Sequence, residues 1–146
     1  MRRSRFLIGA SLAVALTAAL AGGVLAGGKP YSTTLSGAEE APGPGDPDGT
    51  GHVSITVNPG LGTVCYHLAV EDIDPAAAAH IHVGDAGVPG PIVIHLAAPT
   101  SGTSSGCVED VSRELALDLI RNPSHYYVNV HNPAFPAGAV RGQLGD

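Results

Sequence analysis

The chain has 146 residues, a length that fits one compact domain around a single core. Its 13 acidic residues outnumber seven basic ones, and three of the basic residues fall within the first five positions. Residues 27–146 therefore carry four basic against 13 acidic residues, a net charge of −9, which argues against binding to nucleic acid or to anionic lipid.

The first 26 residues have the pattern of an export signal. Three arginines precede an apolar run over residues 6–20, and the segment then ends in small residues at Ala26. We predict cleavage after Ala26, secretion of residues 27–146, and no stable membrane anchor on the mature chain. An uncleaved anchor is the alternative, although the apolar run is short for a membrane span.

Alternating apolar, β-branched and aromatic residues predict seven strands, over residues 31–35, 52–57, 63–70, 78–83, 92–96, 125–131 and 139–144. The segment 58–62, rich in proline and glycine, predicts a hairpin turn between the second and third strands. Residues 41–51 and 100–106 are predicted to be loops, and residues 112–121 a short amphipathic helix. Strands without regularly alternating helices indicate an all-β antiparallel sandwich or barrel with one short helix.

The chain contains two cysteines, Cys65 and Cys107. An even pair in an exported protein most often forms a disulfide, so we predict that these two are bonded. Coordination of a soft metal is the alternative. Two isolated thiols, far apart in the sequence, make a zinc cage a poor fit.

Histidines concentrate on two of the predicted strands. His80 and His82 share one strand face, and Tyr127, Asn129 and His131 align in the same way on another strand. Neutral imidazoles suit copper or zinc, so His80, His82 and His131 form a candidate metal site, with Asn129 and Tyr127 supporting His131. The alternative is that the three rings only hydrogen-bond to loop carbonyls or to each other and stabilise the fold.

Several phrases of this sequence resemble the CHRD domain, the module named after chordin: SGAEE at 36–40, AHIH at 79–82, GPIV at 90–93, YVNVH at 127–131 and AVRGQL at 139–144. The resemblance covers nearly all of residues 27–146 and implies an extracytoplasmic domain with an immunoglobulin-like β-barrel. A weaker similarity links the chain to copper-zinc superoxide dismutases, whose copper ligands lie in segments like His80-Ile81-His82 and Val130-His131. No zinc loop accompanies them, so the similarity does not carry catalysis over.

Two functional hypotheses follow. The leading one is a secreted, non-enzymatic CHRD-type domain without a defined cofactor, which binds an extracytoplasmic protein or a cell-surface ligand. The competing one is a copper-binding protein with superoxide dismutase-like activity through the three histidines. Hydrolase chemistry has no support, because the sequence has no nucleophile motif. We expect Arg141 to form a structural ion pair, and adjacent carboxylates such as Glu39 and Glu40 to be solvated.

Overall fold

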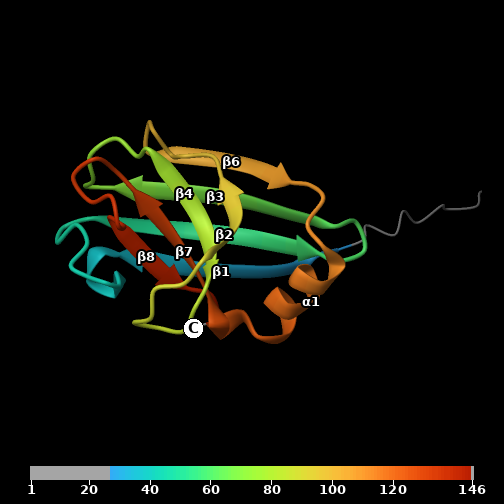
Figure 1. Cartoon of the computed structure of the whole chain (residues 1–146). Helices are drawn as coiled ribbons and strands as arrows, with labels where there is room; N and C mark the ends of the chain where they lie inside the picture. Colours follow the sequence, from blue (N-terminus) through green and yellow to red (C-terminus); the bar gives the residue numbers. More distant parts are fainter. Residues whose placement is uncertain (1–26, 146) are drawn as a thin grey trace, which may run out of the picture.

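The computed structural model describes residues 27–145; the predicted export signal lies outside the described residues. In chain order the elements are β1 (Lys29–Ser36), the 3-10 turn η1 (Gly37–Glu39), β2 (Thr50–Asn58), β3 (Thr63–Glu71), β4 (Ala78–Val83), β5 (Ile92–Leu96), β6 (Thr103–Val108), α1 (Arg113–Arg121), the 3-10 turn η2 (Pro123–His125), β7 (Tyr126–His131) and β8 (Val140–Gln143) (Figure 1).

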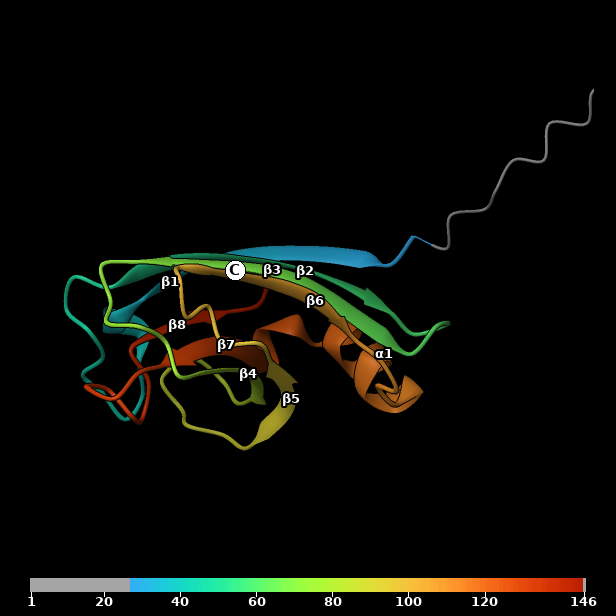
Figure 2. The same cartoon turned by 90° about the horizontal axis from the view of Figure 1, so that it is seen from above.

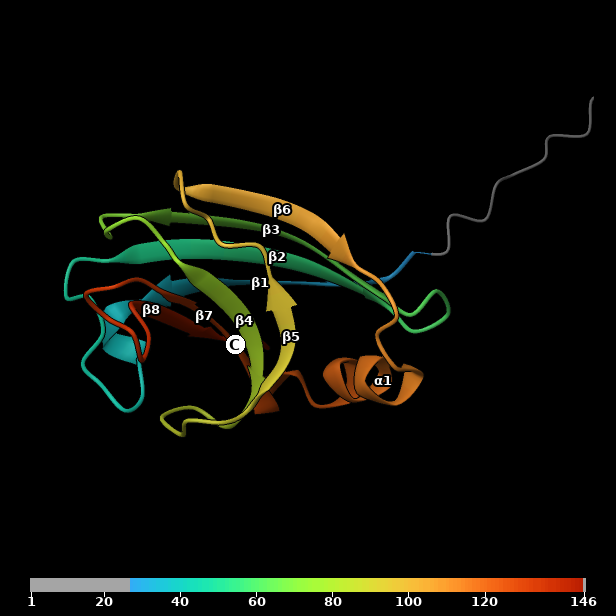
Figure 3. The same ribbon diagram turned by 45° about the horizontal axis from the view of Figure 1, so that its top comes forward.

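Within residues 27–145, eight strands form one antiparallel sheet in the order β5-β4-β7-β8-β1-β2-β3-β6. The sheet folds over into two layers, with β1, β2, β3 and β6 in one and β8, β7, β4 and β5 in the other (Figure 2). Helix α1 lies at one end of the layers (Figure 3). The predicted all-β fold with one short helix is therefore confirmed.

The core follows from strict alternation along the strands. On β2 and β3 every second side chain is apolar and buried, as the sequence pattern predicts. The second layer contributes apolar side chains from β4, β5, β7 and β8. The core residues of these six strands are Val53, Ile55, Val57, Val64, Tyr66, Leu68, Val70, Ala79, Ile81, Ile94, Leu96, Tyr126, Val128, Val130 and Val140.

Helix α1 matches the helix predicted over residues 112–121. The Ser112 side chain accepts a hydrogen bond from the Leu115 backbone N–H at 3.2 Å and so caps the first turn. Ala116 and Leu119 are the buried residues of the helix. In the described part of the chain, none of the helices has both the length and the apolar character that crossing a membrane requires.

Strand β6 corrects the prediction of a loop over residues 100–106. Within the described residues the strand is a mostly exposed sheet edge that pairs with β3 alone, so its sequence shows no apolar alternation. Cys107 on β6 lies directly opposite Cys65 on β3, and the two form a disulfide with an S–S distance of 2.07 Å. The predicted pairing of the cysteines is confirmed.

The second layer carries polar side chains on the face that points away from the core. Strand pairing aligns His95, His80, Asn129 and Arg141 in one row across β5, β4, β7 and β8. Asn129 and Arg141 are nonetheless 2% and 1% exposed. Loop segments contact this face, because backbone carbonyls of residues 84–90 and 136 accept hydrogen bonds from its side chains. The candidate site therefore lies on a loop-covered outer face.

Candidate metal centre

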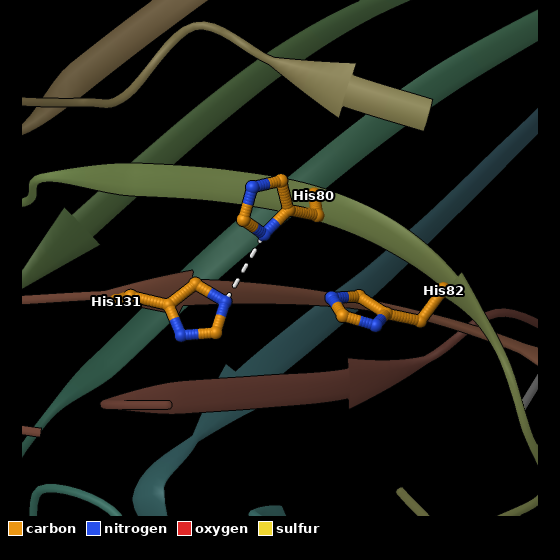
Figure 4. Close-up of side chains that lie close together, drawn as sticks. All are labelled: His80, His82 and His131. Atoms are coloured by element: carbon orange, nitrogen blue, oxygen red, sulfur yellow. Dashed lines mark hydrogen bonds between the residues drawn. The ribbon is translucent and has the colours of Figure 1, made fainter. Parts of the chain in front are cut away.

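Strands β4 and β7 bring the three predicted histidines together (Figure 4). One nitrogen of each ring lies within 4.8 Å of the other two, and His80 Nδ1 is 3.1 Å from His131 Nε2. Two nitrogens that bind one zinc or copper ion at ordinary bond lengths lie about 2.9 to 3.4 Å apart, and about 4.1 Å apart across the ion. A shortening of the longest separations by no more than about 1.5 to 2 Å, shared between two side chains, therefore closes the group around one ion.

His82 presents an unused nitrogen to this space. Its Nδ1 lies 2.8 Å from the Gly90 carbonyl oxygen, which can only accept, so Nδ1 carries the hydrogen and donates. In the neutral ring Nε2 then holds a lone pair. This Nε2 atom is buried, since His82 is only 7% exposed, and it has no hydrogen-bond partner. Buried acceptors without a partner are rare in folded proteins, which makes this one informative.

His131 is oriented in the same manner. Its Nδ1 donates to the Pro136 carbonyl oxygen at 3.1 Å, which leaves the lone pair of the neutral ring on Nε2. Nε2 lies 3.1 Å from His80 Nδ1 and 3.0 Å from Asn129 Oδ1. A backbone carbonyl that fixes the far nitrogen of an imidazole is the usual support of a metal-binding histidine.

The surroundings favour neutral rings. Burial, with further contributions from the rings of His131, His82 and His95, lowers the pKa of His80 to about 4. Burial also lowers the pKa of His131, against the opposing effect of its bond to the Pro136 carbonyl. His80 is therefore neutral at pH 7, and neutral imidazole is the form that binds metal ions.

The two residues expected to support His131 take different places. The Tyr127 ring stacks on His82, with centroids 4.8 Å apart and planes 8° apart, and its hydroxyl accepts from the Gly90 N–H at 3.0 Å. Tyr127 thereby holds both His82 and the residue whose carbonyl orients His82. Asn129 contacts His131 at Nε2, the nitrogen that faces the cluster.

Arg141 is committed to a buried network. Its guanidinium donates to the carbonyls of Asp85 at 2.8 Å and Val88 at 3.1 Å, and it lies 3.4 Å from the centroid of the Tyr127 ring. Among the described residues Arg141 forms no ion pair, so the expected structural ion pair is replaced by hydrogen bonds to loop carbonyls. Burial raises the pKa of the Glu40 carboxyl to about 7, and the positive charge of Arg141 only opposes this rise.

Glu40 corrects the expectation that the Glu39-Glu40 pair is solvated. Glu39 is exposed, but Glu40 is 8% exposed, and one of its carboxyl oxygens is buried without a partner. A side chain at Gly138 would place its Cβ 2.3 Å from both carboxyl oxygens, so the loop after β7 packs directly on Glu40. The two adjacent glutamates therefore differ in exposure because the loop after β7 covers Glu40 and leaves Glu39 in solvent.

Comparison with known protein families matches residues 31–144 to the CHRD domain. The chain belongs to the CHRD domain family. Neither the curated proteins nor the solved structures contain a match. The match covers the whole sheet except the first two residues of β1.

The sequence phrases typical of the CHRD domain meet at the candidate centre. AHIH supplies His80 and His82 on β4, and YVNVH supplies Tyr127, Asn129 and His131 on β7. GPIV begins at the residue that orients His82, SGAEE ends at Glu40, and AVRGQL contains Arg141. Segments far apart in this CHRD domain therefore contribute to one loop-covered group of side chains.

The other histidines lie outside this group or at its margin. His95 is exposed on β5, and its ring stands edge-on to His80 with centroids 5.0 Å apart. His52, His67 and His125 are exposed. His67 on β3 therefore provides a matched control for substitutions in the cluster.

Glu40 should make the stability of the metal-free CHRD domain depend on pH. Burial raises the pKa of Glu40 from 4.5 to about 7, against opposing effects of Arg141, the Ala41 backbone N–H and Asn129. The folded state therefore binds this proton more tightly than the unfolded state. The resulting stabilisation is complete below pH 4.5 and is lost as the pH rises through about 7. The whole shift corresponds to no more than about 3 kcal/mol.

Urea unfolding of the metal-free wild type and of Glu40→Gln, at intervals from pH 5 to 8, measures this contribution. The lowered pKa values of His80 and His131 act in the opposite direction, since they reduce stability as the pH falls below 6.5. Only the difference between the two proteins is therefore diagnostic, and it should shift in favour of Glu40→Gln as the pH rises. Parallel pH curves would contradict the prediction. Glu39→Gln, at the exposed neighbour, should follow the wild type.

Proposed function

We propose that this CHRD domain binds one first-row transition metal ion, copper foremost, through His80, His82 and His131. The observation that carries the proposal is the buried Nε2 of His82, which has no partner although Gly90 fixes the ring in the tautomer that leaves this lone pair free. A structural role would place a donor opposite this lone pair, because an unpaired buried acceptor is unfavourable. A metal ion supplies what the atom lacks.

The donor set supports copper over the other common metal ions. Imidazole suits copper, zinc, iron and nickel, whereas calcium and magnesium require oxygen ligands. Among divalent ions of the first transition row, copper binds a given set of nitrogen ligands most tightly. Both cysteines are joined in the disulfide, so they supply no thiolate to the site.

We also propose that the domain works outside the cytoplasm. The disulfide between Cys65 and Cys107 favours an oxidising compartment, and the first 26 residues have the composition of an export signal. An exported metal-binding domain would hold its ion where the cell does not buffer copper with cytosolic thiols. Mass measurement of the exported protein tests the predicted cleavage after Ala26.

Titration of the metal-free mature protein with copper(II) and zinc(II) tests the metal site. We expect one ion per chain, and a ligand substitution, His82→Ala, should weaken binding at least about 100-fold, beyond the effect typical of a supporting residue. His67→Ala should bind as the wild type does. Circular dichroism of each variant establishes that it is folded. Absence of binding in the wild type, or equal binding by the two variants, would refute the proposal.

Superoxide dismutation does not belong to this proposal. The arginine that the dismutase similarity would use to guide an anion is Arg141, which is 1% exposed and donates to loop carbonyls. A protein or cell-surface partner, the leading hypothesis from the sequence, stays a prediction. Its test is a binding screen with the metal-loaded and the metal-free domain. A partner that contacts the metal site would bind the two forms with different affinities.

A further inference from the structure

We propose that the side-chain oxygen of Asn129 is a fourth ligand of this metal ion, and that Glu40 holds the amide in the orientation that presents it. This inference rests on the proposed metal site. In this inference Asn129 binds the ion directly, whereas a supporting residue would hydrogen-bond to the His131 nitrogen that faces away from the ion. It also gives the buried carboxyl of Glu40 a purpose.

The position of Asn129 is the first argument. Its Oδ1 lies 3.0 Å from His131 Nε2, which is the nitrogen that faces His80 and His82. The opposite nitrogen, Nδ1, already donates to the Pro136 carbonyl. Two ligand atoms on neighbouring positions of one zinc or copper ion lie about 2.9 to 3.4 Å apart. Asn129 Oδ1, His131 Nε2 and His80 Nδ1 are therefore spaced as neighbouring ligands, since the second of these separations is 3.1 Å.

The hydrogen atoms give the second argument. With its hydrogen on Nδ1, neutral His131 has a lone pair on Nε2, and an amide oxygen has only lone pairs to offer in return. Without a cation, no hydrogen stands between these two atoms. His80 Nδ1 can donate to His131 Nε2 in the metal-free protein, but that bond leaves Asn129 Oδ1 facing an acceptor. One metal ion satisfies all three atoms when it binds His80 Nδ1 and the hydrogen of this neutral ring moves to Nε2 of the same ring.

The third argument explains why the amide does not turn over. The Asn129 side chain also hydrogen-bonds to the Glu40 carboxyl. The NH2 group is the only donor of an amide, so a bond donated to this carboxyl uses Nδ2 and leaves Oδ1 toward His131. Glu40 is itself confined, because it is 8% exposed and its carboxyl packs so closely on Gly138 that a Cβ there would lie 2.3 Å from its oxygens.

The fourth ligand sets the preference of the site among oxidation states. An amide oxygen is a hard donor, and three imidazoles with one oxygen suit copper(II) and zinc(II). Copper(I) favours soft sulfur ligands, which the site does not offer. We therefore expect the reduced ion to gain less from Asn129 than the oxidised ion. Asn129→Ala should weaken copper(II) binding by a larger factor than copper(I) binding.

The crystal structure of the zinc-loaded mature protein gives the direct test. We expect zinc bonded to the three histidines and to Asn129 Oδ1, with a zinc–oxygen distance of about 2.0 to 2.2 Å. If zinc binds the three histidines with Oδ1 more than about 3 Å away, the inference falls and the proposed function stands. If zinc does not bind at the histidines, both fall.

Affinity measurements on variants test the two residues separately. Asn129→Ala should bind copper(II) at least tenfold more weakly, whereas Asn129→Asp, which keeps an oxygen at the same place, should bind within a few-fold of the wild type. Glu40→Gln should weaken binding several-fold. The glutamine NH2 group could donate to Asn129 Oδ1, so the reversed orientation of the Asn129 amide would then be satisfied as well. Glu39→Gln is the matched control and should bind as the wild type does. Equal affinities for Asn129→Ala and the wild type would overturn the inference.

Discussion

Replacing Arg141 by methionine is expected to lower the free energy of unfolding by about 3 kcal/mol, the effect of leaving buried acceptors without their donor. Arg141 is 1% exposed, and its charge opposes the rise that burial causes in the pKa of Glu40. Methionine fills a similar volume but leaves the carboxyl of Glu40 without a counter-charge. The carbonyls of Asp85 and Val88 also lose their donor.

Urea unfolding of the metal-free protein at pH 8, where more than half of the Glu40 carboxyl is ionised, measures this loss, because its pKa is about 7. The double variant Arg141→Met/Glu40→Gln should recover part of the stability, since it removes both charges together. Arg141→Lys keeps the charge but cannot reproduce the two-carbonyl contact, so it should fall between the wild type and Arg141→Met. A loss below about 1 kcal/mol in Arg141→Met would contradict the prediction, because it would mean that the loop carbonyls do not depend on this donor.

Removing the disulfide is expected to cost about 4 kcal/mol in the chain-entropy description of the unfolded state. Cys65 and Cys107 are 42 residues apart in sequence, so their bond closes a long loop. The Cys65→Ser/Cys107→Ser double variant avoids free thiols and should unfold at a correspondingly lower urea concentration. Strand β6 lies at the edge of the sheet beside β3, so its detachment should be the first consequence.

Metal affinity serves as a control measurement for the same double variant. The disulfide joins β3 and β6 in one layer, whereas His80, His82 and His131 lie on β4 and β7 in the other. Metal affinity of the folded double variant should therefore equal that of the wild type. A stability loss under about 1 kcal/mol would mean that the reduced chain is already constrained when unfolded.

Much of the fold could be predicted because burial imposes a period of two on a strand. The pattern of β2 and β3 specifies both their faces and their hairpin, and every apolar residue at those alternating positions is buried. The same reasoning failed for β6, where an exposed edge strand needs no apolar face. Cys107 was the one residue of β6 that carried information, and it predicted a bond rather than a strand.

The candidate site divides along similar lines. Alternation placed His80 with His82 and aligned Asn129 with His131, since strand geometry is local. The role of Glu40 depends on a loop that covers the outer face, so its neighbours in the sequence gave no sign of its burial. The carbonyls of Gly90 and Pro136, which orient the two rings, belong to backbone that every residue possesses.

The groups that orient the site come from three separate connections: Gly90 between β4 and β5, Pro136 between β7 and β8, and Glu40 just after η1. The histidines themselves stand on strands whose opposite faces pack in the core. In the proposed metal site, the ligands and the groups that orient them are thus encoded in different parts of the gene. Under this proposal, natural variation or laboratory selection confined to the connections would change affinity and metal preference step by step while the strand framework is inherited unchanged.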